Sequence, residues 1–298
     1  MIKIRVPATS ANMGPGFDSL GVALSLYNYV TVEEIPSGLD IKILDSSGRF
    51  LPKDENNLVY RSMTDLFKHV GYRPGGIRLI LENNIPITRG LGSSSACIVG
   101  GLYAANILAG NPLSKQQLLE MAAAAEGHAD NVTPAIMGGF TVNVQQKQRI
   151  SYVQHNLKSD LRFAAFIPDF VLSTKKSRSI LPLFISHKDA VYNAGHSALL
   201  ASSLISGSYE NIRPAIGDRL HQRYRKRLIP DMDDLFHLCY QHGALGVYLS
   251  GAGPTIMAII KASDKDFHAG ISRILNKKMN NWHLKILEAD NIGAVEIK

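Results

Sequence analysis

A glycine- and serine-rich stretch from Ile85 to Ala96, with the sequence IPITRGLGSSSA, is the segment whose residue types point most directly to chemistry. A strand-like run ends there in a turn with Gly90 and Gly92, and a helix follows directly. Glycines let a backbone approach a ligand closely, and the first free N–H groups of a helix, with the positive end of its dipole, favour an anion. The stretch therefore predicts a phosphate-binding loop, with a glycine turn and a serine cap as the purely structural alternative.

Three serines extend this loop into the helix. Ser93, Ser94 and Ser95 could supply hydroxyls to phosphate oxygens or to a metal ion. The loop is not a Walker A motif, because no Lys follows the glycine, and it lacks the glycine spacing of dinucleotide-binding proteins.

Two other segments are dense in small and turn-forming residues. The first, from Pro7 to Leu24, offers the amide of Asn12 for a hydroxyl and the carboxylate of Asp18 for an ammonium. Each of these side chains could instead form an Asx-turn that holds the loop. The second, from Leu249 to Ile260, resembles a strand, a glycine turn and a strand, which by itself is a weak sign of a backbone that closes on a ligand.

Residue periodicity predicts the elements that must position these motifs. In the first half, β-branched content and alternation predict strands at residues 2–6, 29–34, 39–44 and 77–81. Apolar residues on one face predict a helix from Ser94 to Ala109. A capping box of Ser114 and Gln117 predicts the start of a second helix, which runs to Gly127.

The second half differs in its order of elements. After a strand at residues 140–144, the polar stretch QQKQR is expected to form a hairpin or the link into a second lobe. Strands at residues 162–168, 246–250 and 255–260, with helices near 187–206 and 264–278, predict a mostly antiparallel sheet layered with helices. We therefore expect an α+β fold with lobes at residues 1–155 and 156–298, and a ligand in the crevice between them.

Composition fits a two-lobed protein without a membrane segment. The chain has 298 residues and is 45% hydrophobic, enough for a substantial core. Its first residues lack the apolar run of a signal peptide, and no stretch approaches the ~18 uncharged apolar residues that would span a bilayer. Cys97 and Cys239 have no ligand-like spacing, so neither a disulfide framework nor a zinc site is indicated. We expect a cytoplasmic protein with no membrane partner.

Positive charge is concentrated in two places. The formal net charge is +7, with one basic cluster at residues 175–178 and a denser one at residues 219–227. No helix-turn-helix, zinc-finger or RNA-recognition signature accompanies them, which argues against nucleic acid as a partner. A solvated basic face explains most of these side chains when each is taken singly.

Taken together, the three motifs resemble those of the GHMP kinases. The first motif near the N-terminus, GLGSSSA as the phosphate loop and SGAGPT near the C-terminus match that family in order and spacing, so the resemblance covers essentially the whole chain. It implies two lobes, an N-terminal one like a domain of a small-subunit ribosomal protein and a ferredoxin-like C-terminal one. It also implies transfer of the γ-phosphoryl group of ATP, with Mg²⁺, to a small molecule, and a homodimer.

Three further segments, at residues 126–139, 173–182 and 218–230, are similar to one branch of this family. That branch phosphorylates the side-chain hydroxyl of L-homoserine, a step of threonine biosynthesis. Arg223 departs from the branch, in which proline is expected at this turn. The alternatives are a family member that acts on another small alcohol and a non-catalytic nucleotide sensor, although the intact GLGSSSA loop and Glu120 argue against the sensor.

The resemblance implies residues for ATP and for the metal ion. Adenine would contact Asn57 and Val59, and Mg²⁺ would bind Glu120 and Ser94 (or its neighbour Ser93). The other nucleotide contacts would come from the phosphate loop, namely Pro86, Arg89, Gly90, Leu91, Gly92, Ser93, Ser94, Ser95 and Ala96. An ordinary surface glutamate is the alternative for Glu120.

The implied acceptor site has partners for each group of homoserine. Two arginines would bind its carboxylate, two aspartates are available for its ammonium and two asparagines for its hydroxyl. In that order they are Arg178 and Arg225, Asp18 and Asp130, and Asn12 and Asn131, with His128 either lining the pocket or purely structural.

Three of these residues are the candidates for catalysis, namely Asn131, Asp130 and Arg178. Asn131 lies near the place where some family members have a catalytic aspartate, and an amide is not a useful proton acceptor near neutral pH. We therefore expect Asn131 to orient the hydroxyl, which loses its proton late, with Asp130 as the alternative base. The sequence leaves this choice open.

Overall fold

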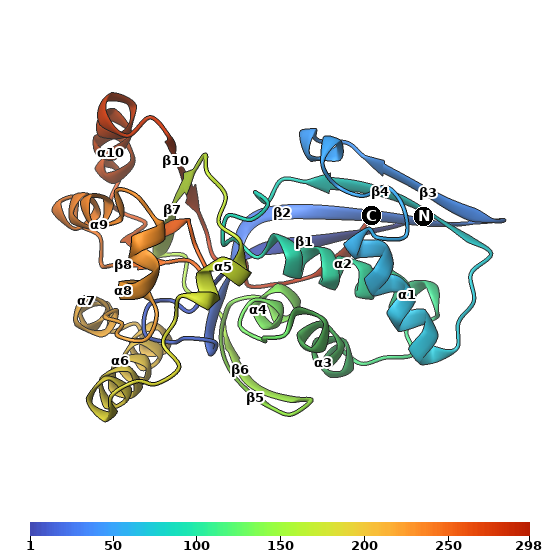
Figure 1. The fold of residues 1–298 in the computed structure, drawn as a ribbon, viewed down its shortest axis with the longest axis horizontal. Coiled ribbons are helices and arrows are strands. Elements are labelled where there is room, and N and C mark those ends of the chain that lie inside the picture. Colours follow the sequence, from blue (N-terminus) through green and yellow to red (C-terminus); the bar gives the residue numbers. More distant parts are fainter.

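The computed structural model describes the backbone of residues 1–298 and every side chain except those of Ser46, Asn276 and Lys278. Two lobes lie along the long axis of the molecule, the first on the right and the second on the left of Figure 1. The strands of the first sheet are β1 (Ile2–Ala11), β2 (Leu20–Ile35), β3 (Gly38–Ile43), β4 (Gly76–Asn83), β5 (Phe140–Gln146), β6 (Arg149–His155) and β11 (Val295–Ile297). The helices of this lobe are α1 (Leu58–Val70), α2 (Ser93–Leu108), α3 (Lys115–Glu126) and α4 (Val132–Met137).

The first sheet is organised around its longest strand, β2. Its order is β11-β1-β2-β4-β3, and every pair in it is antiparallel except β3 with β4. The start of β2, from Leu20 to Val22, pairs with β5, which continues into the β5–β6 hairpin, whereas residues 28–35 of β2 pair with β4. The sequence between β1 and β2 therefore turns at the end of the sheet that faces the second lobe (Figure 1).

The second lobe contains the strands β7 (Leu161–Pro168), β8 (Gly246–Leu249), β9 (Ile256–Lys261) and β10 (Trp282–Leu287), in the antiparallel order β10-β7-β9-β8. Its helices are α5 (Thr174–Ser179), α6 (His187–Ser206), α7 (Ile212–Ala215), α8 (Gln222–Arg225), α9 (Met232–Gln241) and α10 (Asp266–Lys278). Short 3₁₀ helices lie at Ser46–Arg49, Tyr209–Asn211 and Lys226–Leu228.

The second sheet is buried on both faces. Side chains alternate between the faces of a strand, and on β9 Met257 and Ile259 join a core that continues into the first lobe and includes Leu200 of α6. Ile256 and Ala258 point the other way, into a second core formed with α9 and α10. The first of these cores fixes the lobes against one another.

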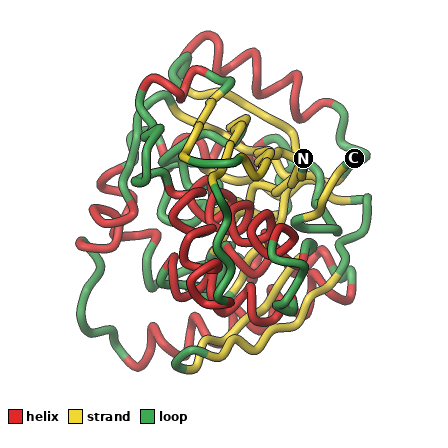
Figure 2. Tube along the Cα trace, turned by 90° about the vertical axis from the view of Figure 1, so that its right-hand side faces the viewer, coloured by secondary structure: helices red, strands yellow, loops and turns green.

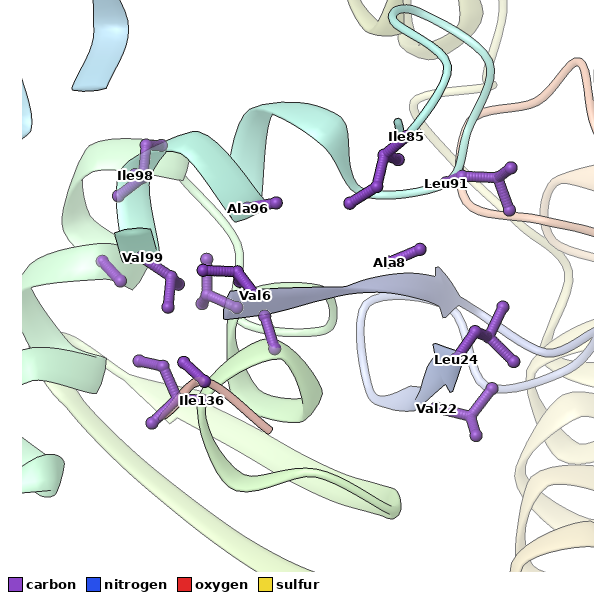
Figure 3. Close-up of a cluster of buried hydrophobic side chains, with 14 of the residues drawn as sticks. Val6, Ala8, Val22, Leu24, Ile85, Leu91, Ala96, Ile98, Val99 and Ile136 are labelled. Carbon is purple, nitrogen blue, oxygen red and sulfur yellow. The ribbon is translucent and has the colours of Figure 1, made fainter. Parts of the chain in front are cut away.

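A compact apolar layer supports the phosphate loop. Figure 3 shows Ile85 and Leu91 on the loop that leads into α2, above the strand that carries Val6 and Ala8, with Val99 of α2 against the same strand. All five side chains are buried. The loop therefore rests on a rigid base formed by β1 and α2.

Most strands and helices expected from periodicity are present, and several are longer. β1 continues to Ala11 and β2 begins at Leu20, so much of the small-residue segment from Pro7 to Leu24 is strand. The stretch QQKQR spans the turn of the β5–β6 hairpin. Helices α1, α4, α5, α7, α8 and α9 and strands β10 and β11 had not been expected.

The end of the chain lies in the first lobe. We expected residues 156–298 to form the second lobe, but β11 pairs with β1, as in the register of Ile4 with Glu296. The amide of Gly139 also donates to the carbonyl of Asp290, at 2.6 Å. Figures 1 and 2 accordingly show the N and C ends on the same side of the molecule. In the described part of the chain, no helix combines the length and apolar character needed to cross a bilayer.

Candidate active site

A cavity of about 280 Å³ lies between the two lobes. The first lobe contributes the phosphate loop, the start of α1 and the residues around the start of α4, and the second contributes α5, α8 and the turn after β8. The apolar side chains Leu51, Leu58 and Val59 lie at the wall formed by α1, whereas charged side chains come from α5, α8 and residues 126–130. The cavity is thus apolar at one wall and charged at another.

The phosphate loop presents the open end of α2 to this cavity. The cap residue Gly92 has φ of 69°, and no side chain caps the first turn of α2. A Cβ atom at Gly92 would lie 2.0 Å from the Oγ1 atom of Thr9, so both the backbone angle and the space require glycine. The amide of Thr9 also donates to the carbonyl of Leu91, at 3.1 Å. The loop is therefore pinned to β1 with the first N–H groups of α2 uncapped, as an anion site requires.

The structure divides the nucleotide residues expected from the phosphate loop. Those that line the cavity are Arg89, Gly90, Gly92, Ser93, Ser94 and Ser95. Leu91 and Ala96 are instead fully buried in the core, as Figure 3 shows, and Pro86 does not line the cavity either. These three positions shape the loop and do not face a ligand.

Arg89 has a different environment from the one expected of a phosphate ligand. Its guanidinium donates to the carbonyls of Pro168, at 2.8 Å, and of Asp169, both at the end of β7. It also donates to the carbonyl of Ile87, at 3.2 Å. The side chain therefore ties the phosphate loop to the second lobe, and three of its donors are already in use.

The carboxylate beside the loop serines is Glu126, not Glu120. The hydroxyl of Ser94 donates to the Glu126 carboxylate, at 3.0 Å, and both residues line the cavity. Glu120 lies outside the cavity lining, and its carboxylate accepts a hydrogen bond from Gln116, at 2.9 Å. Six residues of α-helix correspond to a rotation of about 240°, so the two glutamates of α3 point in different directions. Our assignment of Glu120 to the metal is corrected accordingly.

Ser94 and Glu126 fit a hard divalent cation. Mg²⁺ takes oxygen ligands and usually keeps several waters while it bridges phosphate oxygens, so a hydroxyl and a carboxylate suffice on the protein side. Among the described side chains there is no group of three or more His, Cys, Asp and Glu that could hold a metal. The donor set therefore suits a cation that arrives with the nucleotide.

Asn57, which was expected to contact adenine, bonds to the protein backbone at both ends of its amide. The Oδ1 atom of Asn57 accepts from the amide of Val59, at 3.0 Å, and caps α1, while its Nδ2 donates to the carbonyl of Pro52, at 2.8 Å. Asn57 thus holds the loop before α1, and Val59 is buried against the cavity. Burial, with smaller contributions from Glu126 and Asp45, raises the pKa of the nearby Cys97 thiol to about 12, so this wall stays uncharged.

The acceptor end holds an ion pair between two residues that we expected to bind opposite ends of the substrate. The guanidinium of Arg178 donates to both carboxylate oxygens of Asp18, at 3.1 and 2.6 Å. The two side chains are 37% and 36% exposed, so a ligand can reach them. The ring of Phe17 packs against Arg178, at 5.5 Å from its guanidinium carbon. Arg178 lines the cavity, whereas Asp18 lies outside its lining and is joined to it through this ion pair.

Arg225 lies behind this pair and is 1% exposed. It donates to the carbonyls of Gly251, at 2.9 Å, and Ser177, at 3.3 Å. Because a guanidinium only donates, the Nδ1 atom of His221 accepts from Arg225, at 3.1 Å, and its Nε2 donates to the carbonyl of Gly14, at 2.8 Å. Burial and the neighbouring Arg178 lower the pKa of Arg225 to about 10, so it remains charged at neutral pH.

Asn131 and Asp130 lie beneath the phosphate loop. The hydroxyl of Thr9 donates to the Oδ1 atom of Asn131, at 2.8 Å, and the Nδ2 atom of Asn131 donates to the Asp130 carboxylate, at 3.4 Å, which leaves the second Nδ2 proton for a ligand. Asp130 contacts His128 through a carboxylate-to-Nδ1 hydrogen bond of 2.8 Å. Burial opposes the imidazolium form of His128, but the hydrogen bond and charge of Asp130 outweigh it and raise the pKa of His128. Asp130 is therefore engaged with His128, and Asn131 can donate into the cavity.

Asn12 lines the cavity, but both ends of its side-chain amide are bonded to the protein backbone. Its φ is 66°, its Nδ2 donates to the carbonyl of Gly251, at 2.8 Å, and its Oδ1 accepts from the amide of Asp18, at 2.9 Å. Both ends of the amide are in use. This geometry favours the loop-holding alternative over direct contact with a hydroxyl.

Several residues of the site were missed by sequence reasoning. Glu126 ends its helix directly before the segment that carries His128 and Asp130, and this position was the available signal. Thr174, next to the cap of α5, lines the cavity in the same segment as Arg178. Thr9 gave no signal, because its role depends on a contact with Asn131 across 122 positions of sequence.

Comparisons with known proteins agree with this geometry. Residues 57–139 match the family described as GHMP kinases N terminal domain, and residues 200–280 match GHMP kinases C terminal. A homoserine kinase of Caldicellulosiruptor saccharolyticus is 49% identical over 296 residues, which cover 99% of this chain and 96% of the relative. A homoserine kinase of Clostridium botulinum (strain ATCC 19397 / Type A) is 45% identical over 99% of this chain and 98% of the relative.

Similarity of structure extends over the same length. The crystal structure of homoserine kinase from Cytophaga hutchinsonii superposes with a TM-score of 0.87 at 30% identity, over 99% of this chain and 97% of that one. The two-lobe α+β fold that the motifs predicted is thus confirmed. With both family domains in order and relatives that match along nearly their whole length, the chain belongs to the GHMP kinases, a family of phosphate-transferring enzymes.

Proposed function

We propose that the protein transfers the γ-phosphoryl group of ATP to the side-chain hydroxyl of L-homoserine, which forms O-phospho-L-homoserine for threonine biosynthesis. The observation that carries this proposal is that Arg178 and Arg225 line the same cavity as the phosphate loop, with Asp18 bonded to Arg178 just outside the lining. An amino acid with a terminal hydroxyl matches that arrangement, because its two charges meet opposite charges on the protein. The names of the relatives support the same substrate.

The Asp18–Arg178 ion pair favours a zwitterion over other alcohols. A zwitterionic substrate can bring its ammonium to Asp18 and its carboxylate to Arg178, so neither charge is left without a partner. A neutral alcohol that separated Asp18 from Arg178 would give neither side chain a new charged partner. An unpaired charge in a partly buried site is costly. Arg225 adds a second, fully buried cation behind the carboxylate position.

Asn131 and Asp130 suggest how the hydroxyl is handled. The Oδ1 atom of Asn131 already accepts from Thr9 and one Nδ2 proton points to Asp130, so the second Nδ2 proton would orient the hydroxyl oxygen. An amide is not a useful proton acceptor near neutral pH, so Asn131 would not remove the hydroxyl proton. Asp130 is already bonded to His128. In a loose transition state the hydroxyl need not lose its proton early, so we propose that the proton passes late to the phosphoryl oxygen.

The phosphate loop, Ser94 and Glu126 would hold the nucleotide with Mg²⁺. The uncapped amides of α2 bind phosphate oxygens, while the hydroxyl and carboxylate hold the cation. When bound, Mg²⁺ would neutralise negative charge on the phosphates. The apolar wall at Leu58 and Val59 fits a flat base.

A panel of acceptors tests the proposed reaction. The purified protein is incubated with ATP, Mg²⁺ and either L-homoserine, mevalonate or galactose, and product is identified by ³¹P nuclear magnetic resonance while ADP is measured in parallel. L-Homoserine should give a phosphomonoester with a kcat/KM at least ~100-fold above the other two, because only it pairs both charges of the site. A preference for either of the others would refute the proposal and leave a GHMP kinase of another specificity.

A substitution at Asp18 tests how the zwitterion is recognised. Asp18→Asn should raise the KM for L-homoserine by about 10-fold or more, because a charge-assisted hydrogen bond contributes roughly 1.5–3 kcal/mol. The wild type should discriminate strongly against 4-hydroxybutyrate, which lacks the ammonium, and the variant should lose much of that discrimination. Both constants come from steady-state assays of ADP release.

The matched control for this experiment is Asp189→Asn. Asp189 pairs with Arg219 and Arg223, at 3.5 and 3.0 Å, and neither of these arginines lines the cavity, whereas Arg178, the partner of Asp18, does. Asp189→Asn should leave unchanged the ratio of kcat/KM for L-homoserine to kcat/KM for 4-hydroxybutyrate. An unaltered ratio in Asp18→Asn would remove Asp18 from the ammonium position.

We also propose that the protein acts as a cytoplasmic homodimer. The family resemblance supports the dimer, and the two cysteines, neither of them in a disulfide, suit a reducing compartment. Size-exclusion chromatography with light scattering measures the mass of the particle directly. A mass near the 32.6 kDa of one chain would exclude the dimer under those conditions.

A further inference from the structure

Three buried hydroxyl groups form a line between the two lobes. The hydroxyl of Tyr248, at the end of β8, lies 3.1 Å from the Oγ atom of Ser10 in β1. Ser10 Oγ lies 2.7 Å from Ser250 Oγ, and Ser250 Oγ lies 2.6 Å from the carbonyl oxygen of Gly90 in the phosphate loop. Ser10, Tyr248 and Ser250 are each 0% exposed, so water does not compete for these bonds.

The last contact fixes the direction of the whole line. A carbonyl oxygen only accepts, so the proton of Ser250 points to Gly90. The hydroxyl of Ser250 must then accept from Ser10, and that of Ser10 must accept from Tyr248. Burial raises the pKa of Tyr248, so its hydroxyl keeps the proton that starts the line. Hydrogen bonds aligned in one direction strengthen one another.

The turn that carries Ser250 also contacts the acceptor end of the cavity. The carbonyl of Gly251 accepts from both Asn12, at 2.8 Å, and Arg225, at 2.9 Å. The carbonyl of Ala252 accepts from Ser177, one residue before Arg178, at 2.6 Å. The same short turn thus holds the groups proposed for the acceptor on one side and the phosphate loop on the other.

The turn also contacts the phosphate loop through its backbone. The amide of Thr255 donates to the carbonyl of Arg89, at 3.1 Å. A Cβ atom at Gly90 would lie 2.4 Å from the carbonyl oxygen of Ser250, so the two backbones are in direct contact. The turn therefore fixes the position of the phosphate loop relative to the acceptor groups, and loss of its bonds to either side would change that position.

We infer that Tyr248, Ser10 and Ser250 are positioning residues that set the phosphate loop at its working distance from the acceptor site. Neither substrate needs to touch them. Their effect is on the alignment of donor and acceptor, where a misplacement of about 1 Å can cost on the order of 100-fold in rate. This inference rests on the proposed phosphorylation of L-homoserine and adds the element that aligns its two halves.

The substitution Ser250→Ala tests the inference most directly. It removes the donor to Gly90 and leaves the Ser10 proton without its acceptor. The kcat with L-homoserine should fall by about 10- to 100-fold, whereas the KM values for ATP and L-homoserine should stay within about 3-fold, because the binding groups remain. Tyr248→Phe removes the first donor and leaves the bond to Gly90, so its kcat should fall by less than that of Ser250→Ala.

The matched control is Ser203→Ala in α6. Ser203 is also a buried serine, and its hydroxyl donates to a carbonyl, that of Leu199, at the same 2.6 Å. It does not line the cavity, so the variant should lose thermal stability to a similar degree and keep the wild-type kcat. Thermal unfolding and near-ultraviolet circular dichroism establish that each variant is folded at the assay temperature.

The outcomes separate the inference from the proposed function. A folded Ser250→Ala with wild-type kcat, or with its loss confined to KM, would overturn the inference, as would a larger kcat loss in Tyr248→Phe. If Ser250→Ala does not fold, Ser10→Ala decides, because it breaks the line but keeps the bond from Ser250 to Gly90; its kcat should fall about 3-fold or more. Wild-type protein that does not phosphorylate L-homoserine would instead refute the proposed function.

Discussion

Glu126→Gln should lower the turnover of ATP and L-homoserine by at least ~100-fold, which corresponds to ~2.7 kcal/mol of transition-state stabilisation. The amide keeps the size of the side chain and removes the charge that a divalent cation requires beside Ser94. The Mg²⁺ concentration at half-maximal rate should rise as well, while the dissociation constant of L-homoserine, measured by calorimetry without nucleotide, should change little. Steady-state assays at several Mg²⁺ concentrations measure both effects.

The control for this variant comes from the same helix. Glu120→Gln makes the same chemical change on α3, at a side chain that bonds to Gln116 and does not line the cavity. It should keep near-wild-type turnover. If Glu120→Gln loses activity and Glu126→Gln keeps it, the metal position inferred from the structure is wrong.

Arg178→Ala should raise the KM for L-homoserine by about 30-fold or more, equivalent to ~2 kcal/mol, and change the KM for ATP little. The guanidinium is the exposed member of the two acceptor-site arginines, so its loss removes a contact with the substrate carboxylate and leaves the fold intact. Acceptors without a carboxylate should be poor substrates of the wild type and should lose little more in the variant. Initial rates over a range of L-homoserine concentrations give the two constants.

Arg223→Ala is the matched control, because Arg223 is also partly exposed and paired with an aspartate, but it does not line the cavity. It should leave both KM values unchanged. Arg225→Ala is a poorer test, since its removal would leave the carbonyl of Ser177 and the Nδ1 atom of His221 without their buried donor and would destabilise the protein. Normal phosphorylation of L-homoserine by Arg178→Ala would exclude Arg178 from the carboxylate site.

Local sequence signals predicted the parts of the fold that depend on neighbours in the chain. The capping box of Ser114 and Gln117 is present at the start of α3, and α2 begins one residue before the expected Ser94. The segment from Pro7 to Ala11 was harder, because a buried strand of small and polar residues lacks the alternation of a half-exposed one. Likewise, Asn57 was interpreted as a contact to the base, although it caps the unexpected helix α1.

The site itself depends on contacts that no local pattern encodes. The choice between Glu120 and Glu126 requires knowing which face of α3 meets the phosphate loop. The pairing of Asp18 with Arg178 joins residues 160 positions apart, so the sequence identified both side chains but not their bond. The hydroxyl line through Ser250 similarly joins Ser10 of β1 to a residue in the turn after β8, 240 positions away in sequence.

The pairing of β1 with β11 has a consequence for synthesis of the chain. Residues 3–5 find their antiparallel partners only at residues 295–297, so the outer edge of β1 stays open until nearly all of the described sequence has been made. At bacterial and eukaryotic elongation rates this interval is about 15 to 60 seconds. An unpaired edge can join another strand during that time, and long-range pairing of this kind slows folding. The first lobe therefore leaves the ribosome first but is completed only after the second lobe has been made. A nascent chain whose synthesis stops before β11 would expose this edge to chaperones.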